Sequence, residues 1–152
     1  MIVEKTSAKE RVLNVAEELF HERGYNAVSM RDIAEALEMR QASLYYHVPD
    51  GKEQLYVEVT ERGLQRHQEG LAEAIKNAEP HIAAQLKAAS QWFASHMPMK
   101  LLSMLETDMP AISTENSQKL VFMAYEAMFM PIAQLFQEAM DRGEVRQMDP
   151  NQ

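Results

Sequence analysis

Residues 29–52 read SMRDIAEALEMRQASLYYHVPDGK, and this stretch predicts two helices joined by a tight turn. Ser29 and Asp32 have the spacing of a capping box, which starts a helix by satisfying its first free N–H groups. Apolar residues then recur at helical spacing until a break at Glu38. A second, very short helix follows at residues 40–47. The pattern is that of a helix-turn-helix unit.

The short helix at 40–47 carries polar and aromatic side chains on most of its faces. These side chains are Arg40, Gln41, Ser43, Tyr45, Tyr46 and His47. A helix on an ordinary surface has no packing reason to expose two tyrosines, an amide and a guanidinium group together. In the major groove of DNA the same groups read base edges and contact phosphates. The pattern indicates a DNA-reading helix. The competing interpretation is a helical corner whose tyrosines pack against the first helix.

Residues 7–55 resemble the DNA-binding domain of the TetR family of bacterial transcriptional regulators. The resemblance is carried, in order, by AEELF at 16–20, GY at 24–25, VSMRDIA at 28–34, ASLYYH at 42–47 and KEQL at 52–55. One departure is Glu38, where the family often has glycine in the turn, because glutamate accepts a positive φ poorly. Another is Gly51, which lengthens the link to the next helix by one residue.

The resemblance implies which residues of the head contact DNA. Base-edge contacts would come from Arg31, Gln41, Ala42, Ser43 and Tyr45. Phosphate contacts would come from Ser29, Tyr46, His47 and Lys52, with Arg40 flanking the reading helix. Two heads of a homodimer would occupy successive major grooves of a palindromic double-stranded operator, about 34 Å apart.

The composition fits a globular protein of ordinary size. The chain has 152 residues, of which 46% are hydrophobic, and it contains no cysteine, so a disulfide framework or a thiolate metal site is excluded. The net charge of -8 is unusual for a nucleic-acid binder. Residues 1–52 contain 7 Lys and Arg against 9 Asp and Glu. Binding would therefore depend on dimerisation and sequence readout more than on bulk charge.

Helix signals run along the whole chain, and no strand pattern appears. We therefore predict an all-α fold, with a three-helix helix-turn-helix DNA-binding head at residues 1–50 and a helical effector-binding and dimerisation body at 51–152. Ser7 and Glu10 would cap the first helix, and Asp50 with Glu53 would cap the fourth. Gly63 and Gly70 in this fourth helix are unfavourable unless a neighbouring backbone approaches closely. The remaining helices are expected at about 80–95, just after Pro98, and from about 113 to 142.

The two ends of the chain bear on the compartment and on the family resemblance. The start, MIVEKTSAKE, lacks the apolar core of a signal peptide. The most apolar stretch, 120–132, is shorter than the ~20 residues of a membrane span, so we expect a cytoplasmic protein without a membrane partner. Asp149 and Pro150 form a helix-start signal two residues before the end. In the resembled family two more helices usually follow and form the dimer interface, so we expect a shortened family member.

Methionine and aromatic residues are concentrated in the helical body. The chain has 12 methionines, and methionine adapts to apolar ligands of varied shape, although it also fills ordinary cores. The resemblance implies an effector pocket for a lipophilic or aromatic small molecule. The residues expected to line it are Trp92, Phe93, His96, Met104, Phe122, Tyr125 and Phe129. His67, His81, Glu106 and Asp108 could orient a ligand, but a solvated surface role is the simpler expectation for each.

Taken together, these features favour a sequence-specific DNA-binding transcriptional regulator, a repressor released by a small-molecule effector. We expect no catalytic residues, no metal site and no cofactor, because no serine elbow, phosphate-binding glycine loop or zinc spacing is present. One alternative is an all-α ligand-binding or metal-binding protein, or an enzyme, that does not bind DNA. Another is a shortened relative that binds a small molecule or a protein but no longer grips DNA.

Overall fold

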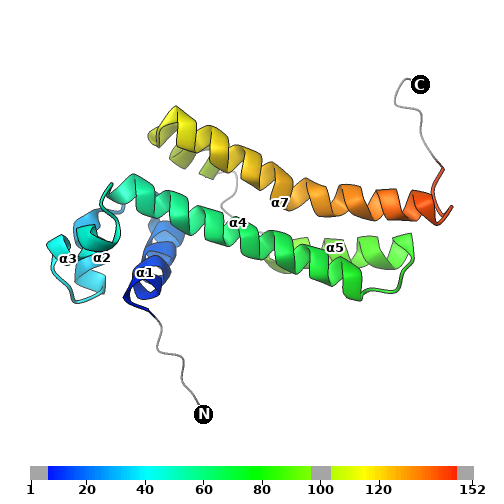
Figure 1. The fold of residues 1–152 in the computed structure, drawn as a ribbon, viewed down its shortest axis with the longest axis horizontal. Helices are drawn as coiled ribbons and strands as arrows, with labels where there is room; N and C mark the ends of the chain where they lie inside the picture. Colours follow the sequence, from blue (N-terminus) through cyan, green and yellow to red (C-terminus); the bar gives the residue numbers. More distant parts are fainter. Residues whose placement is uncertain (1–6, 97–103, 147–152) are drawn as a thin grey trace, which may run out of the picture. The chain divides into compact units, whose positions relative to one another are not determined.

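The computed structural model describes residues 7–96 and 104–146, and every regular element in these ranges is helical (Figure 1). The elements are α1 (Ala8–Arg23), α2 (Met30–Ala36), α3 (Gln41–His47), α4 (Lys52–Asn77), α5 (Ile82–His96), the π-helical turn η1 (Met104–Asp108), the 3-10 turn η2 (Met109–Ala111) and α7 (Thr114–Asp141). This confirms the all-α prediction. The predicted helix after Pro98 falls mainly on 97–103, and the signal at Asp149 lies beyond 146, so both lie outside the described residues.

The contacts divide the chain into two compact units. Among the described residues, the first unit contains 7–62 and 104–120, and the second contains 63–96 and 121–146. The prediction placed one domain boundary after residue 50. In the structure both α4 and α7 begin in the first unit and continue into the second. The unit that contains the helix-turn-helix therefore also includes the start of α4 and a segment from late in the sequence.

The first unit is built on α1, α2 and α3, which contact one another pairwise and lie together in Figure 1. Two of the three predicted capping boxes are present, whereas the predicted box of Asp50 with Glu53 is not formed, because Glu53 accepts from Ser113 and Asn116 instead. Ser7 and Glu10 exchange hydrogen bonds at the start of α1, and Ser29 and Asp32 do the same at the start of α2. Each box satisfies N–H groups that a helix start leaves without partners. These local bonds fix where the two helices begin and set the approach of the turn to α3.

The turn between α2 and α3 has the left-handed backbone that the family resemblance implied. Glu38 has φ of 53°, and it is a non-glycine residue with positive φ. A side chain in this conformation is strained because its Cβ crowds the neighbouring carbonyl oxygen. The turn is nevertheless closed by hydrogen bonds from the Glu38 N–H to the Glu35 carbonyl and from the Met39 N–H to the Ala34 carbonyl. The turn therefore keeps its geometry at a cost in stability.

The core of the first unit joins residues that are far apart in the sequence. Val12, Ile33, Leu44 and Leu55 are completely buried in it. The segment 104–120 adds Met109, Ile112 and Leu120 to the same cluster. Side chains from a segment that follows α5 thus complete the core to which α3 contributes Leu44.

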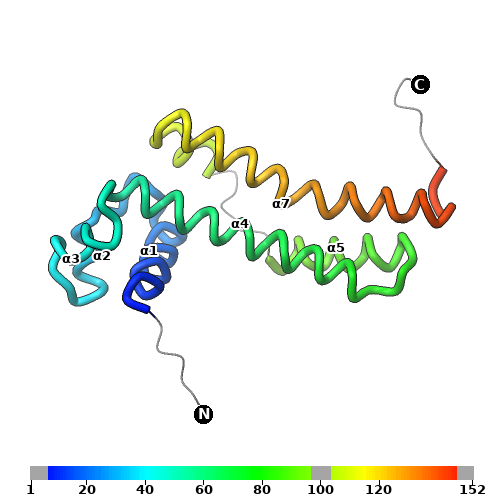
Figure 2. The backbone as a smooth tube through the Cα atoms, in the orientation of Figure 1, coloured from blue at the N-terminus to red at the C-terminus, as the bar shows by residue number. Residues whose placement is uncertain are grey.

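The second unit packs the later part of α4 against α5 and the body of α7. Its buried residues are Leu71, Ile75, Ala89 and Leu135, with Trp92 and Phe93 packed against them. Figure 2 shows α5 running alongside α4 and α7, and each of the three is one continuous helix. Gly70 explains how the indole of Trp92 lies so close to α4. A Cβ built at Gly70 would lie 2.1 Å from a Trp92 ring carbon, so only glycine admits the indole.

Helix α7 has an exposed apolar face. Phe122, Tyr125, Phe129 and Phe136 lie on this face at helical spacing, and each is exposed. By length and hydropathy alone α7 is also the one helix among the described residues that could cross a membrane. Buried core helices of soluble proteins pass the same test, but only 22% of the relevant window of α7 is buried. The exposed aromatic side chains of α7 therefore need an explanation other than burial in the core.

Candidate nucleic-acid interface

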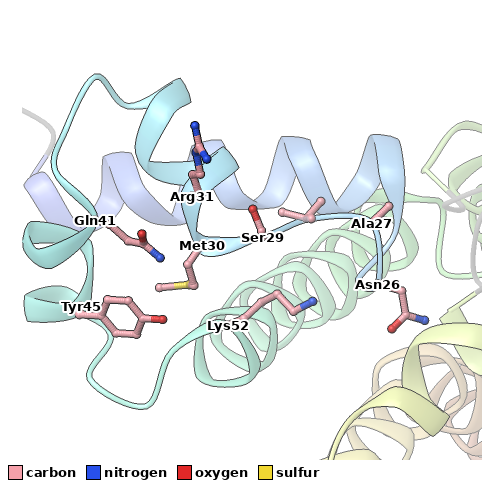
Figure 3. Close-up of a pocket in the computed structure, with 9 residues that line it drawn as sticks. Asn26, Ala27, Ser29, Met30, Arg31, Gln41, Tyr45 and Lys52 are labelled. Carbon is pink, nitrogen blue, oxygen red and sulfur yellow. The ribbon is translucent and has the colours of Figure 1, made fainter.

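An open groove of ≈ 400 Å³ lies on the surface of the head, beside α3. It is lined by Asn26, Ala27, Val28, Ser29, Met30, Arg31, Gln41, Tyr45 and Lys52. Figure 3 shows Gln41 and Tyr45 extending from α3 toward Met30 at the start of α2, with Lys52 nearby at the start of α4. Two helix starts and one reading helix thus present amide, hydroxyl, guanidinium and ammonium groups to one concave surface.

The structure leaves all ten predicted DNA-binding residues accessible. Eight are exposed, namely Ser29, Arg31, Arg40, Gln41, Ala42, Ser43, Tyr45 and Tyr46, while His47 and Lys52 are half-buried. Tyr46 is 85% exposed, and Tyr45 is 41% exposed. Leu44 is the buried anchor of α3 in the core. The tyrosines are therefore directed outward, which contradicts the interpretation of α3 as a corner packed into its own protein.

Five of these ten residues meet in the groove, and the others lie outside its lining. Ser29, Arg31, Gln41, Tyr45 and Lys52 line it. The groove is also lined by four residues that were not predicted to bind DNA, Asn26, Ala27, Val28 and Met30. These residues line the groove because the loop between α1 and α2 passes close to α3. Nothing in the sequence of a short loop predicts such a tertiary contact.

Lys52 is held by the backbone and ring of Tyr25. Its Nζ donates a hydrogen bond of 3.0 Å to the Tyr25 carbonyl and lies 4.1 Å from the centre of the Tyr25 ring. Partial burial lowers the pKa of Lys52. An ammonium group has three N–H donors, and the bond to Tyr25 uses one of them. The group is thus fixed in position while retaining donors for an anion.

Arg31 and Ser29 are each engaged by a neighbouring acid. Arg31 Nε donates to Glu35 at 2.7 Å on the exposed side of α2, and this bond raises the pKa of Arg31. Ion pairs at the surface contribute little, so Arg31 can exchange Glu35 for another acceptor. The Ser29 hydroxyl serves the cap with Asp32, whose pKa is lowered by the hydrogen bonds from Ser29. Ser29 thus contributes structure to the groove edge.

The end of α3 is tied to two other helices through Lys9. Lys9 Nζ donates to the His47 carbonyl at 2.9 Å and pairs with Glu58 at 2.7 Å. A cation at a helix C-terminus satisfies a free carbonyl and opposes the negative end of the helix dipole. This link holds the seven-residue reading helix against α1 and α4.

Asp108 is a buried residue that the sequence interpretation placed on a solvated surface, and this expectation is wrong. Its carboxylate accepts hydrogen bonds from the Tyr25 N–H at 3.1 Å and from the Tyr56 hydroxyl at 3.2 Å. Burial, together with the Asp108 charge, raises the pKa of Tyr56 above its usual value. The partners lie 83 and 52 positions away in the sequence. Nothing local to residue 108 could have indicated them.

The seven residues predicted to bind an effector belong to both units, Met104 to the first and the other six to the second. Met104 packs against the core of the first unit. Phe122, Tyr125 and Phe129 are 61%, 56% and 54% exposed on α7. The three predicted residues of α5 lie together, because Trp92 stacks on His96 with ring centres 3.7 Å apart and Phe93 packs in the same cluster. The described residues contain no group of three or more potential metal ligands.

His67 belongs with the α5 residues and was not predicted to have a structural role. The Trp92 indole N–H donates to His67 Nδ1 at 3.4 Å, and the His67 and Phe93 rings lie 5.6 Å apart. His67 Nε2 is buried and has no hydrogen-bond partner among the described residues. Burial, and to a lesser extent His96, lowers the pKa of His67. A buried polar atom without a partner is costly and marks a place where a ligand can bind.

Comparison with known proteins agrees with the geometry of the head. The family model for bacterial regulatory proteins of the tetR family matches residues 12–59. The biofilm operon icaADBC HTH-type negative transcriptional regulator IcaR of Staphylococcus epidermidis is 40% identical over 48 residues, 32% of this chain and 25% of IcaR. The match therefore spans a quarter of the length of that curated relative.

Solved structures extend the similarity beyond the head. The TetR family transcriptional regulator PfmR from Thermus thermophilus is 26% identical with a TM-score of 0.66, over 91% of this chain and 75% of PfmR. AibR, solved in complex with isovaleryl coenzyme A and operator DNA, is 22% identical with a TM-score of 0.69, over 95% of this chain and 78% of AibR. At this identity AibR shows a shared fold. Residues 12–59 therefore match a tetR-family helix-turn-helix head, and the chain shares its all-α fold with the TetR family regulator PfmR.

Proposed function

We propose that this protein is a sequence-specific DNA-binding transcriptional regulator that acts as a repressor. The observation that carries the proposal is the outward presentation of α3, with Gln41 and Tyr45 facing the same groove as Arg31 and Lys52. These are the groups that recognise base edges and phosphates in a major groove. The similarity of the head to IcaR, a negative transcriptional regulator, supports repression.

The proposed contacts divide into positioning and reading. Base edges are read by Arg31 from α2 and by four residues of α3, namely Gln41, Ala42, Ser43 and Tyr45. Ser29, Arg40, Tyr46, His47 and Lys52 hold phosphates on either side. This assignment places the polar N-terminal turn of α3 deepest in the major groove of the DNA, which is the usual docking of a recognition helix.

The acidic balance of the head is compatible with DNA binding because several of its acids are already paired. Glu10 and Asp32 serve helix caps. Glu17, Glu35 and Glu58 form ion pairs with Arg62, Arg31 and Lys9. Since few phosphates are neutralised by bulk charge, affinity rests on directed contacts and on two heads binding together.

The operator would be a palindrome bound by a homodimer, and the exposed face of α7 is the surface we propose for pairing. Phe122, Tyr125, Phe129 and Phe136 give it an apolar stripe, and Glu126 is the one charged residue between 121 and 137. Two copies could therefore pair without opposing large numbers of like charges. Pairing through α7 would also explain this face in a protein that we place in the cytoplasm, without a membrane.

We propose that a small-molecule effector binds beside Trp92, Phe93 and His96 and releases the DNA. Trp92 can only donate from its indole N–H, so His67 Nδ1 is the acceptor and the hydrogen of the neutral ring lies on Nε2. That buried N–H is suited to an acceptor oxygen of a ligand whose remainder is lipophilic or aromatic. The binding of isovaleryl coenzyme A by AibR, which shares the fold, supports an effector of this type. Release requires that the ligand favour a head separation that does not fit DNA.

Selection from a random duplex library tests the proposal directly. The intact protein at low salt should enrich an inverted repeat whose half-sites lie about one helical turn apart, roughly 34 Å. The paired variant Gln41→Ala with Ser43→Ala should enrich no repeat or a degenerate one, because it removes two base-reading side chains. Absence of any enriched repeat with the intact protein, at concentrations where it is oligomeric, would contradict DNA-binding function. It would favour a family member that binds a ligand or a protein alone.

A further inference from the structure

The segment 108–116 is fastened to the first unit by polar bonds as well as by its core residues. The Asp108 carboxylate accepts from the Tyr25 N–H and the Tyr56 hydroxyl, and its side chain is 9% exposed. A buried carboxylate is tolerated only where such bonds replace water. The bonds therefore fix the carboxylate and the backbone of Tyr25 relative to each other.

Tyr25 is bonded on both sides of its backbone. Its N–H donates to Asp108, and its carbonyl accepts from Lys52 Nζ at 3.0 Å. Its ring lies beneath the same ammonium group and packs against Tyr56, with ring centres 5.0 Å apart. A displacement of the Tyr25 backbone would thus move the only carbonyl to which the described structure bonds Lys52.

The residue after Lys52 is held by the same segment. Glu53 accepts hydrogen bonds from the Ser113 N–H at 3.0 Å and from the Asn116 side-chain amide at 2.7 Å, and these bonds lower its pKa. Two neighbouring residues of the first turn of α4 are therefore positioned by residues 108–116, one through Tyr25 and one directly. Lys52 in turn lines the groove with Gln41 and Tyr45.

From these contacts we infer that Asp108 is a positioning residue for DNA binding, which acts through Tyr25 to hold the Lys52 ammonium group at the edge of the groove. This inference rests on the proposed function, since the groove is its target. Asp108 itself lies in the core and does not touch DNA. Because α7 begins at Thr114 within the same segment and continues to Asp141, the segment also gives the body a covalent route to the groove.

A double-mutant cycle on the selected operator tests this inference. Asp108→Ala removes the acceptor for the Tyr25 N–H and should weaken operator binding about five- to tenfold. In a Lys52→Gln background the same substitution should change affinity by less than about twofold, because the residue through which it acts is gone. Asp108→Asn keeps an oxygen of the same shape and should restore most of the affinity. Equal losses in both backgrounds would overturn the inference.

Tyr56→Phe is the matched control. It removes the other bond to the Asp108 carboxylate but keeps the ring that packs on Tyr25. It should lower the free energy of unfolding while leaving operator affinity unchanged. A loss of affinity equal to that of Asp108→Ala would show that core stability, and not the position of Lys52, controls binding. If Asp108→Ala does not fold, Asp108→Leu fills the space and offers no acceptor.

An NMR measurement on the protein without DNA tests this inference separately from the proposed function. The protons on the carbon bearing Lys52 Nζ lie near the Tyr25 ring and should have NMR shifts displaced upfield by the ring current. Asp108→Ala should abolish that displacement, and Asp108→Asn and Tyr56→Phe should preserve it. An unchanged Lys52 signal in Asp108→Ala would reject the positioning role even if the protein binds DNA. Failure to select any operator would reject the proposed function and leave this spectroscopic test decisive.

Discussion

The indole N–H of Trp92 donates to Nδ1 of His67, and this bond defines the charge state of the histidine. A protonated imidazole has a hydrogen on both nitrogens, so it would set a donor against the Trp92 donor. The folded protein therefore favours neutral His67, in agreement with the lowering of its pKa by burial and by His96. Gly70 completes the arrangement because it leaves space for the indole ring.

Stability should fall as the pH is lowered below about 6.5, the usual pKa of histidine in an unfolded chain. The unfolded chain then takes up a proton at His67 more readily than the folded protein, whose His67 pKa is lowered. The contribution is complete above that pH and is lost progressively as the pH falls toward the pKa of the folded state. Urea unfolding at pH 7.5 and 5.5 measures it, with His67→Gln as control. An equal fall in His67→Gln would contradict the assignment.

The two glycines inside α4 should respond oppositely to alanine. A Cβ added at Gly63 would meet open space, with only the Arg66 guanidinium at 4.0 Å, so Gly63→Ala should raise the free energy of unfolding by up to about 1 kcal/mol. Gly70→Ala would force the methyl group into Trp92 and should lower it by about 1–3 kcal/mol. Chemical denaturation measures both. Because Trp92 is the single tryptophan, its fluorescence should change in Gly70→Ala alone.

The strained turn between α2 and α3 predicts a stabilising substitution. Glu38→Gly removes a Cβ from a residue with φ of 53° and should raise the free energy of unfolding by about 0.5–1 kcal/mol. Ala36→Gly, at the exposed last residue of α2, should instead lower it by up to about 1 kcal/mol. Thermal unfolding of the two variants distinguishes the left-handed site from the helical one. Destabilisation by both would show that the turn is not strained at Glu38.

Base reading and phosphate contact should separate in binding assays. Gln41→Ala should relax preference at one operator position by about tenfold, because a bidentate side chain is lost. Lys52→Ala should weaken all sequences similarly and reduce the slope of log affinity against log salt by about 1. Lys87→Ala removes the same charge from an exposed site on α5 and should change neither quantity. Identical profiles for Gln41→Ala and Lys52→Ala would refute the separate roles.

The exposed stripe on α7 should control the oligomeric state. Phe122→Ser combined with Phe129→Ser removes two aromatic side chains that are more than half exposed, and should weaken dimerisation at least about tenfold. Ala133→Ser, an exposed change on the same helix, should leave it unaltered. Sedimentation equilibrium over a range of concentrations measures both. An unchanged association constant in the double variant would place the interface elsewhere.

Local signals in the sequence predicted the helices well because each signal acts over a few residues. The capping boxes at Ser7 and Ser29 and the apolar spacing of α2 lie within one or two helical turns. The outward direction of Tyr46 also follows from local pattern, since Leu44 is the buried anchor of α3. The accessibility of the predicted DNA-binding residues was therefore open to sequence reasoning.

Contacts between residues far apart in the sequence could not be predicted from local patterns. Glu53 was expected to complete a cap with Asp50, but its carboxylate bonds Ser113 and Asn116, about 60 residues later. Asp108 resembled any acid of a polar loop, although it is buried against Tyr25. A distant donor can compete with a local cap for the same carboxylate. The spacing of residues along one helix does not predict such a distant donor. The assumption that Gly70 required a close backbone was wrong in the same way, since a tryptophan side chain occupies the space.

Met109, Ile112 and Leu120 complete the core of the first unit, and this arrangement affects biosynthesis. A ribosome that has joined residue 62 must add 58 more residues to reach 120, which takes roughly 3 to 12 seconds at about 5–20 residues per second. During that interval the nascent head exposes the apolar surface that these three side chains later cover. Chaperone binding should therefore persist on nascent chains until residue 120 has left the exit tunnel, and the head should acquire protease resistance only then.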